Sequence, residues 1–294
     1  MLGVFDSGFG GLPVLRAIRD ALPDLAITYL GDNARTPYGD RSRESVTEFT
    51  KECCTVLFER GCSLIILACN TASADTLREL QQNWLPTLGH RTLDVGQRNK
   101  IPSPKSSHRD LRQVPSPKNI LGVVRPLAEE AVLRTKTGRI AVVGTRSTVA
   151  SGAYVHELTH LRPDVTVMQQ ACPLLVPLVE EGWEQKPEAR KILRTYLRPV
   201  KAANPDVLIL GCTHYEILYP VFRKMMGRRC MVLHSPTVVA RKLGEYLVAH
   251  PEYDGTIPRT GEVVFLTTGD PERFAQLGSR FYGRRIAKVA HVRL

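Results

Sequence analysis

The sequence has no long apolar segment. None of its apolar runs approaches the roughly 20 residues that cross a bilayer, so we expect no transmembrane helix and no membrane partner. The opening residues MLGVFDSGFGG lack the basic and apolar regions of a secretory signal, which predicts a cytoplasmic protein. The seven cysteines are odd in number and follow no regular spacing. This usage favours free thiols in a reducing compartment over a disulfide framework.

Acidic residues are also scarce. The chain has 29 Asp and Glu against 40 Lys and Arg, a net charge of +11. Much of the excess lies in residues 87–119, which contain two PSPK tetrapeptides and no sustained apolar periodicity. Such a composition cannot order itself as a core element, so we predict an inserted, mobile loop. The segment lacks interleaved aromatic residues for base stacking, so we do not expect nucleic-acid binding. A binding protein that uses this insert on nucleic acid or an acidic partner remains an alternative.

Two stretches of the chain are versions of each other. Residues 64–73 read LIILACNTAS, and residues 207–216 read VLILGCTHYE. Each is a short apolar run, typical of a buried strand, that leads into a cysteine and a polar residue. Cys69 and Cys212 therefore occupy equivalent places. Because the carboxyl ends of parallel strands line the ligand crevice, we expect one thiol from each half in a shared cleft, an arrangement suited to two-sided proton chemistry.

The rest of the chain alternates between apolar runs and helical patterns. A helix is expected over Val46–Phe58, and Leu12, Leu15 and Ile18 share one face of another. Further strands are expected at Leu2–Phe5, Ile27–Leu30, Ile120–Val124 and Ile140–Val143. This order predicts an α/β fold of two pseudo-symmetric lobes, each a mainly parallel sheet flanked by helices, with the active site in the cleft between them.

The cysteines have a structural and a chemical interpretation. A free cysteine often behaves as a small buried hydrophobe, and we interpret five in that way: Cys53, Cys54, Cys62, Cys172 and Cys230. Cys69 and Cys212 precede polar residues, where the amides of a helix start could stabilise a thiolate. His214 adds a titratable partner. A zinc site of these three residues is the competing hypothesis, but no fourth ligand is evident, so we expect no metal.

The turn DSGFGG lies between a strand and a helix start. It does not supply the G-x-G-x-x-G pattern of a dinucleotide site, and Asp6 stands at its mouth. We interpret its backbone amides and the Ser7 hydroxyl as a cradle for a small carboxylate ligand, with Asp6 free to accept protons. A helix cap is the alternative interpretation.

Six ordered motifs carry a resemblance to a known family. They read GVFDSGFGGLPVL, ARTPYG, ACNTAS, VVGTRST, ACPLLVPLVEEG and LGCTHYEIL. In this order they resemble the glutamate racemases of the aspartate/glutamate racemase superfamily. The resemblance covers nearly the whole chain, including the closing FLTTGDPERFAQLGSRFYG, and leaves out only the insert. The ACPLLVPLVE and PYG segments favour glutamate over aspartate or hydantoin relatives.

The resemblance implies an activity and a set of roles. The activity is a cofactor-independent interconversion of L- and D-glutamate, supplying D-glutamate for peptidoglycan. Cys69, assisted by Asp6, would act on one face of Cα, and Cys212, assisted by His214, on the other. The positions matching those that hold the substrate or lie beside it are Asp6, Ser7, Pro37, Tyr38, Gly39, Asn70, Thr71, Thr145, Thr148, Glu180, Thr213 and His214.

The resemblance also implies lobe boundaries, and the sequence departs from the family pattern at two places. It assigns residues 1–119 and 231–294 to the first lobe and 120–230 to the second, and homodimers are common in the family although arrangements vary. Glu216 stands where the family usually has proline, and we expect this carboxylate to raise the pKa of His214. The insert is the other departure. A superfamily racemase or decarboxylase with another substrate, such as aspartate, remains an alternative.

Overall fold

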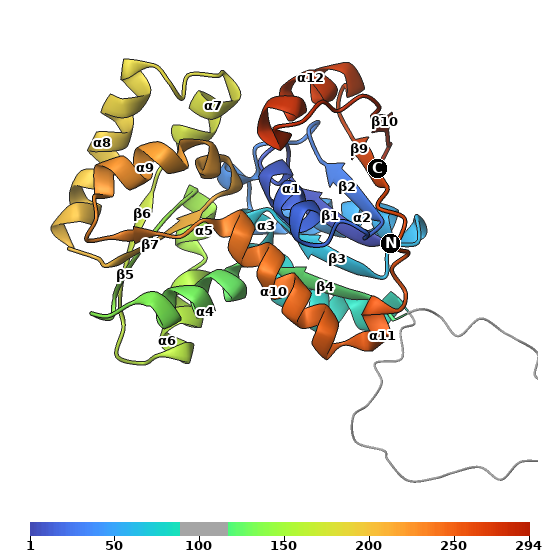
Figure 1. Ribbon diagram of the computed structural model, residues 1–294, viewed down its shortest axis with the longest axis horizontal. Coiled ribbons are helices and arrows are strands. Elements are labelled where there is room, and N and C mark those ends of the chain that lie inside the picture. Colours follow the sequence, from blue (N-terminus) through green and yellow to red (C-terminus); the bar gives the residue numbers. More distant parts are fainter. Residues whose placement is uncertain (89–116) are drawn as a thin grey trace, which may run out of the picture.

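The computed structural model describes residues 1–88 and 117–294 and contains two parallel sheets with helices on their faces (Figure 1). The predicted α/β fold of two lobes is confirmed. Most of the basic segment 87–119, for which we predicted an inserted loop, lies outside the described residues. Within the described ranges, no helix is long and apolar enough to cross a membrane.

The first sheet has six strands in the order β10-β9-β2-β1-β3-β4. Its strands are β1 (Leu2–Asp6), β2 (Ile27–Gly31), β3 (Leu64–Leu67), β4 (Asn119–Gly122), β9 (Val263–Thr267) and β10 (Ala290–His291). All neighbouring strands are parallel. From β1 the chain first adds β2 on one side and later β3 on the other. This change of direction opens a crevice at the carboxyl end of β1, where α/β proteins bind ligands.

The second sheet repeats this arrangement with four strands in the order β6-β5-β7-β8. They are β5 (Arg139–Gly144), β6 (Thr166–Ala171), β7 (Val207–Gly211) and β8 (Met231–Val232), all parallel. β6 and β7 lie on opposite sides of β5, so a second crevice opens at the carboxyl end of β5. Strands β3 and β7, which the two cysteines Cys69 and Cys212 follow, thus each lie beside one of these crevices.

The strand pairing shifts both predicted lobe boundaries. Ile120 lies in β4, which pairs with β3 of the first sheet rather than beginning the second lobe. Met231 lies in β8, which pairs with β7 of the second sheet. The chain therefore crosses to the second sheet after residue 122 and leaves it after residue 232. An apolar run predicts a strand, but the sheet that the strand joins depends on contacts with residues far away in the sequence.

Helices cover both faces of the sheets. Up to residue 88 they are α1 (Leu12–Ala21), η1 (Tyr38–Asp40), α2 (Arg43–Glu59), α3 (Asn70–Glu79), the π-helical η2 (Leu80–Trp84) and η3 (Leu85–Leu88). Between β4 and β8 they are α4 (Val124–Arg134), α5 (Arg146–Ala150), α6 (Ala153–Leu161), α7 (Leu175–Glu180), α8 (Pro187–Ala202), η4 (Thr213–Leu218) and α9 (Tyr219–Met226). After β8 follow α10 (Ser235–Ala249), α11 (Pro251–Asp254) and α12 (Pro271–Tyr282).

Local sequence explains where several helices begin and which side they bury. Leu12, Leu15 and Ile18 of α1 are fully buried, as their spacing predicts. Helix α2 starts before the predicted Val46, because the Ser42 side chain accepts a hydrogen bond from the N–H of Ser45 and caps it. Helix α10 packs against both α1 and α4 and bridges the two lobes (Figure 1).

Candidate active site

Both cysteine motifs open onto one cavity between the lobes. Cys69 follows β3 and caps α3, and Cys212 follows β7 and precedes η4. The residues that line the cavity are Ser7, Thr36, Pro37, Tyr38, Gly39, Cys69, Asn70, Thr71, Thr145, Val176, Cys212, Thr213 and His214. Its volume is about 20 Å³, which is room for about one water molecule. An amino acid needs more space than this, so we expect the cavity to widen when a substrate enters.

Cys69 lies in a dry, acidic environment. Its side chain is buried, and its Sγ donates to the Oγ of Ser7 at 3.5 Å. Burial and the nearby Asp6 carboxylate raise the pKa of the Cys69 thiol to about 12. Both effects disfavour the charged form. Before a substrate arrives, this group is therefore a thiol that can give a proton.

Asp6 connects the first lobe to the motif that carries the second thiol. Its Oδ1 accepts from the N–H of Gly8 at 2.9 Å, and its Oδ2 accepts from the Thr213 hydroxyl at 3.2 Å. Burial raises the pKa of Asp6 above its ordinary value, although His214 and these donors act in the opposite direction. A carboxylate that binds a proton more readily than usual can exchange one with a neighbouring thiol.

Cys212 has a cationic neighbour instead. The Nε2 of His214 lies 3.0 Å from the Oε1 of Glu180 on α7. Burial lowers the pKa of His214, but hydrogen bonds to Cys212 and Glu180 outweigh this effect and raise it to about 10. The ring is then an imidazolium at neutral pH, which places positive charge beside the sulfur of Cys212. The two thiols therefore lie in opposite electrostatic settings, one beside a carboxyl group and one beside a cation.

A group of hydroxyls forms the wall of the cavity where the lobes meet. The oxygen of Thr71 on α3 lies 3.0 Å from that of Thr145 and 3.2 Å from that of Thr148. Next to them, the Tyr154 hydroxyl on α6 donates to Oδ1 of Asn70 at 2.5 Å. Neutral donors of this kind suit a small zwitterionic ligand better than a highly charged one.

The turn before α2 supplies another part of the cavity wall, next to Thr145. Tyr38 is buried, and its hydroxyl donates to Oδ2 of Asp32 at 2.5 Å. A Cβ added at Gly39 would lie 2.7 Å from Thr145, so only glycine permits this approach of the lobes. The Oγ1 of Thr36 is buried and has no hydrogen-bond partner within residues 1–88 and 117–294. This oxygen belongs to a residue that lines the cavity, so it can bind a ligand.

The structure gathers the residues that the sequence singled out and distributes them over two layers. Nine of them line the cavity with Cys69 and Cys212: Ser7, Pro37, Tyr38, Gly39, Asn70, Thr71, Thr145, Thr213 and His214. Asp6, Thr148 and Glu180 do not line the cavity but lie within hydrogen-bond distance of Thr213, Thr71 and His214, which do. Sequence reasoning missed Thr36, Val176, Asp32 and Tyr154. The sequence did carry a signal for Asp32. This carboxylate directly follows β2, just as Asp6 directly follows the apolar residues of β1.

Glu216 does not have the predicted role. The carboxylate that raises the pKa of His214 is Glu180, whereas Oε1 of Glu216 accepts from the N–H of Ser235 at 3.1 Å. Glu216 therefore ties η4 to the start of α10, away from the cavity. Burial raises the pKa of its own carboxyl group to about 8.

The positions of the cysteines bear on the zinc alternative and on the five cysteines that we interpreted as buried hydrophobes. Among the described residues, no group of three or more His, Cys, Asp or Glu side chains is arranged to hold a metal ion. All seven cysteines are buried free thiols. Only Cys69 and Cys212 among them line the cavity.

Comparisons with known proteins agree in the type of fold and chemistry. A family model described as Asp/Glu/Hydantoin racemase matches residues 106–243. A glutamate racemase of Geobacter metallireducens is 36% identical over 293 residues, covering 100% of this chain and 96% of the relative. One from Bacillus cereus is also 36% identical and covers 100% of this chain and 97% of the relative.

Solved structures show the same similarity in three dimensions. A glutamate racemase isoform from Bacillus anthracis superimposes with a TM-score of 0.81 at 31% identity, covering 100% of this chain and 97% of that one. The glutamate racemase of Thermus thermophilus, solved with β-chloro-D-alanine, gives a TM-score of 0.77 at 33% identity, with 100% and 96% covered.

Proposed function

Since this chain belongs to the glutamate racemase family of isomerases, we propose that it interconverts L- and D-glutamate without a cofactor, by proton transfer between Cys69 and Cys212. The observation that carries this mechanism is the pair of thiols on one closed cavity, each from the end of an equivalent strand. Inversion needs a proton removed from one face of Cα and another delivered to the opposite face. A single fixed base cannot do both.

In the reaction, one sulfur acts as thiolate and the other as thiol. The thiolate takes the α-proton, and the electron pair of the broken C–H bond remains on Cα and spreads into the α-carboxylate. The opposite thiol then gives its proton to the other face of Cα. Cys212 begins as the base when L-glutamate is bound, and Cys69 begins as the base when D-glutamate is bound. Each turnover thus exchanges their protonation states.

The surroundings of the two sulfurs support this exchange. His214 provides positive charge beside Cys212, and its hydrogen bond to Glu180 holds the ring in place. Asp6, with its raised pKa, assists Cys69 on the other side. The dry cavity strengthens these interactions and places the donors around a developing negative charge. The hydroxyls of Ser7, Thr36 and Thr71 are proposed to hold the carboxylates and the amine of the substrate.

Hydrogen exchange at Cα tests the mechanism. The protein is incubated with L- or D-glutamate in deuterated water, while circular dichroism follows inversion and NMR follows deuterium at Cα. We expect Cys69→Ala and Cys212→Ala each to abolish inversion, although the remaining thiol can still exchange a proton on its own face. Cys62→Ala and Cys230→Ala, which remove buried thiols outside the cavity, are the matched controls. Racemisation retained by either active-site variant would refute the two-thiol mechanism, and inversion of aspartate but not glutamate would refute the substrate.

We propose further that the D-glutamate formed supplies peptidoglycan synthesis. The family resemblance supports this role. The chain should restore growth without added D-glutamate to a bacterial strain that has lost its own glutamate racemase. Failure of the wild-type chain to restore growth, despite activity in the purified protein, would refute the cellular role and leave the reaction standing.

A further inference from the structure

The outer surface of the second lobe carries cations without acidic partners. Between residues 163 and 240, no lysine or arginine forms an ion pair with any part of the chain that the structure describes. These cations, which we call the cationic face, are Lys186, Arg190, Lys191, Arg194, Arg198, Lys201, Arg223, Lys224, Arg228 and Arg229. Arg241 on α10 is different, because it contacts both Glu130 and Glu245.

Helix α8 gathers half of these charges on one flank. Its buried side consists of Ala189, Leu193, Leu197 and Val200. At 3.6 residues per turn, positions 190, 191, 194, 198 and 201 fall within a sector of about 100° next to that side. Like charges at a spacing of four residues repel each other, and Glu188 is the residue of the first turn whose charge suits the helix dipole. Packing within the chain therefore does not account for this arrangement.

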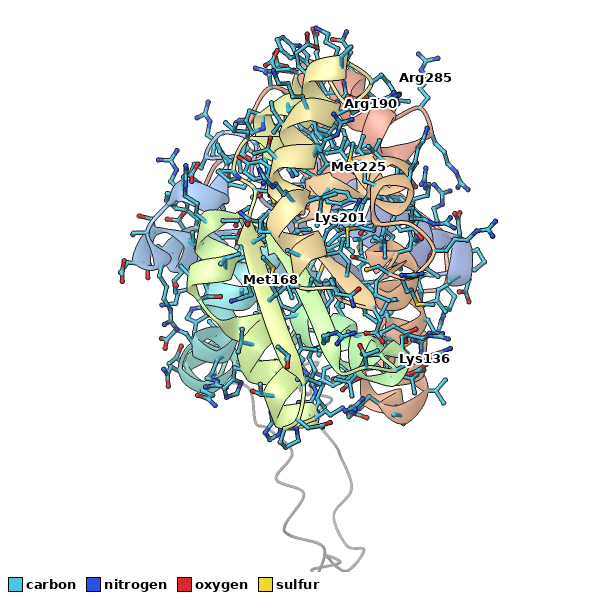
Figure 2. All side chains as sticks on the ribbon, turned by 90° about the vertical axis from the view of Figure 1, so that its left-hand side faces the viewer. Lys136, Met168, Arg190, Lys201, Met225 and Arg285 are labelled. Atoms are coloured by element: carbon cyan, nitrogen blue, oxygen red, sulfur yellow. The ribbon has the colours of Figure 1, made fainter. Side chains whose placement is uncertain are left out.

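The first half of α8 borders a hollow of suitable chemistry for an anion. The hollow has a volume of about 400 Å³, and its walls include Arg190, Lys191 and Arg194. Gln185 and Pro187 complete it, so no acidic side chain lines it. Figure 2 faces α8 and shows Arg190 toward one end of the helix and Lys201 toward the other, on the outside of the molecule. A phosphate group in this hollow would meet several cations at once.

An exposed tryptophan marks the same end of α8. Trp183 is 42% exposed, although tryptophan is usually well buried. It lies in the connection from α7 to α8, and the Nζ of Lys186 lies 3.8 Å from the centre of its ring. Tryptophan next to lysine and arginine is typical of surfaces that contact the polar layer of a bilayer, where the ring and the cations both find partners.

We propose that the cationic face, led by the α7–α8 corner, binds the surface of an anionic lipid membrane, which departs from the expectation of no membrane partner that rested on the lack of a membrane-spanning segment. The cations of α8 contact the lipid phosphates, and Trp183 enters the interfacial layer. Duplex nucleic acid fits less well, because a groove about 12 Å wide admits a single helix, whereas α9 packs against α8. The binding is peripheral and independent of the racemase site, since none of these residues lines the active-site cavity.

Vesicle sedimentation tests the proposal with the whole protein. We expect binding to vesicles of equal parts phosphatidylglycerol and phosphatidylcholine at about 50 mM NaCl, and loss of binding at about 500 mM, where charges are screened within a few ångströms. Vesicles of phosphatidylcholine alone should not bind. The triple variant Arg190→Gln, Arg194→Gln, Arg198→Gln should bind at least about tenfold more weakly, since each removed cation weakens attraction to an anionic surface.

A second triple variant separates the site from net charge. Arg60→Gln, Arg273→Gln and Lys288→Gln remove three exposed cations from the first lobe and should leave vesicle binding unchanged. Both triples should keep the amino-acid turnover of the wild type, which shows that they fold. The fluorescence of Trp183 should shift to shorter wavelength on anionic vesicles, and Trp183→Phe should abolish the shift. Absence of vesicle binding, equal losses in both triples, or tighter binding to a DNA duplex than to vesicles would each overturn the proposal.

Discussion

Replacing Glu216 by glutamine should make the stability of this protein less dependent on pH. The side chain lies in the interior between η4 and the start of α10, with one oxygen bound to the N–H of Ser235 and the other without a partner in the described ranges. The Nε2 of His234 lies 3.9 Å from Oε2 of Glu216. Burial and its own neighbour Arg16 lower the pKa of His234, so it is a weak counter-ion at neutral pH. Glutamine keeps the shape and the acceptor and removes the charge.

The magnitude follows from the two protonation equilibria. In the unfolded chain Glu216 loses its proton near its ordinary pKa of 4.5, whereas in the folded protein it keeps the proton up to about pH 8. Between these values the folded state binds more protons, so wild-type stability falls as the pH rises. One pKa unit corresponds to about 1.4 kcal/mol, so the contribution between pH 5 and pH 8 is about 3–4 kcal/mol. Domains are commonly stable by only about 5–15 kcal/mol.

Urea unfolding at several pH values measures this difference. Trp183 lies in the same lobe as Glu216, so its fluorescence reports the relevant transition. The free energy of unfolding of Glu216→Gln should exceed that of the wild type by an amount that grows from about pH 5 to about pH 8 and then stays constant. Glu181→Gln, which changes an exposed carboxylate of the same lobe, should follow the wild type at every pH. A constant difference between Glu216→Gln and the wild type would refute the argument.

Three further substitutions test the cavity and its walls. Thr36→Val removes an unpartnered hydroxyl that we expect to bind substrate, so steady-state kinetics should show a raised KM with a smaller change in kcat; an unchanged KM would contradict this role. Tyr154→Phe leaves Oδ1 of Asn70 without its donor and should cost about 1–3 kcal/mol of stability in thermal unfolding; an unchanged midpoint would show that water replaces the bond. Gly10→Ala brings a Cβ within 2.2 Å of the Thr213 hydroxyl, which follows Cys212, so kcat should fall more than about tenfold with the fold retained by circular dichroism. Gly244→Ala, with its nearest neighbour at 4.0 Å, should stay fully active.

The parts of the fold that sequence could predict depend on local patterns. The runs LIIL and VLILG are fully buried strands, and the helix spacing of Leu12, Leu15 and Ile18 placed them in the core. Both cysteines could be placed at strand ends because the polar residues follow the apolar runs directly. The assignment of the site residues to one cavity needed the parallel arrangement of the sheets, which the alternation of strands and helices also predicts.

The features that sequence could not predict join residues that are far apart in the chain. Tyr154 contacts Asn70, which lies 84 positions away in the sequence, and no sequence pattern around either residue predicts this contact. The same holds for the sheet partners of β4 and β8, because a strand of two to four residues can complete either sheet. Thr36 is recognisable only when its surroundings show that no group among the described residues satisfies its hydroxyl. Folding of the chain into two packed lobes creates these relationships, so they appear only in three dimensions.

The small size of the active-site cavity affects how readily its cysteines are oxidised. The thiolate is the form of cysteine that attacks peroxides, and oxidation beyond the sulfenic acid is irreversible in most proteins. With room for about one water molecule in the cavity, an oxidant reaches Cys69 and Cys212 more readily while the lobes are apart. The rate of damage therefore rises with the fraction of time that the lobes spend apart. A bound amino acid that holds the lobes together would lengthen the working life of the two sulfurs.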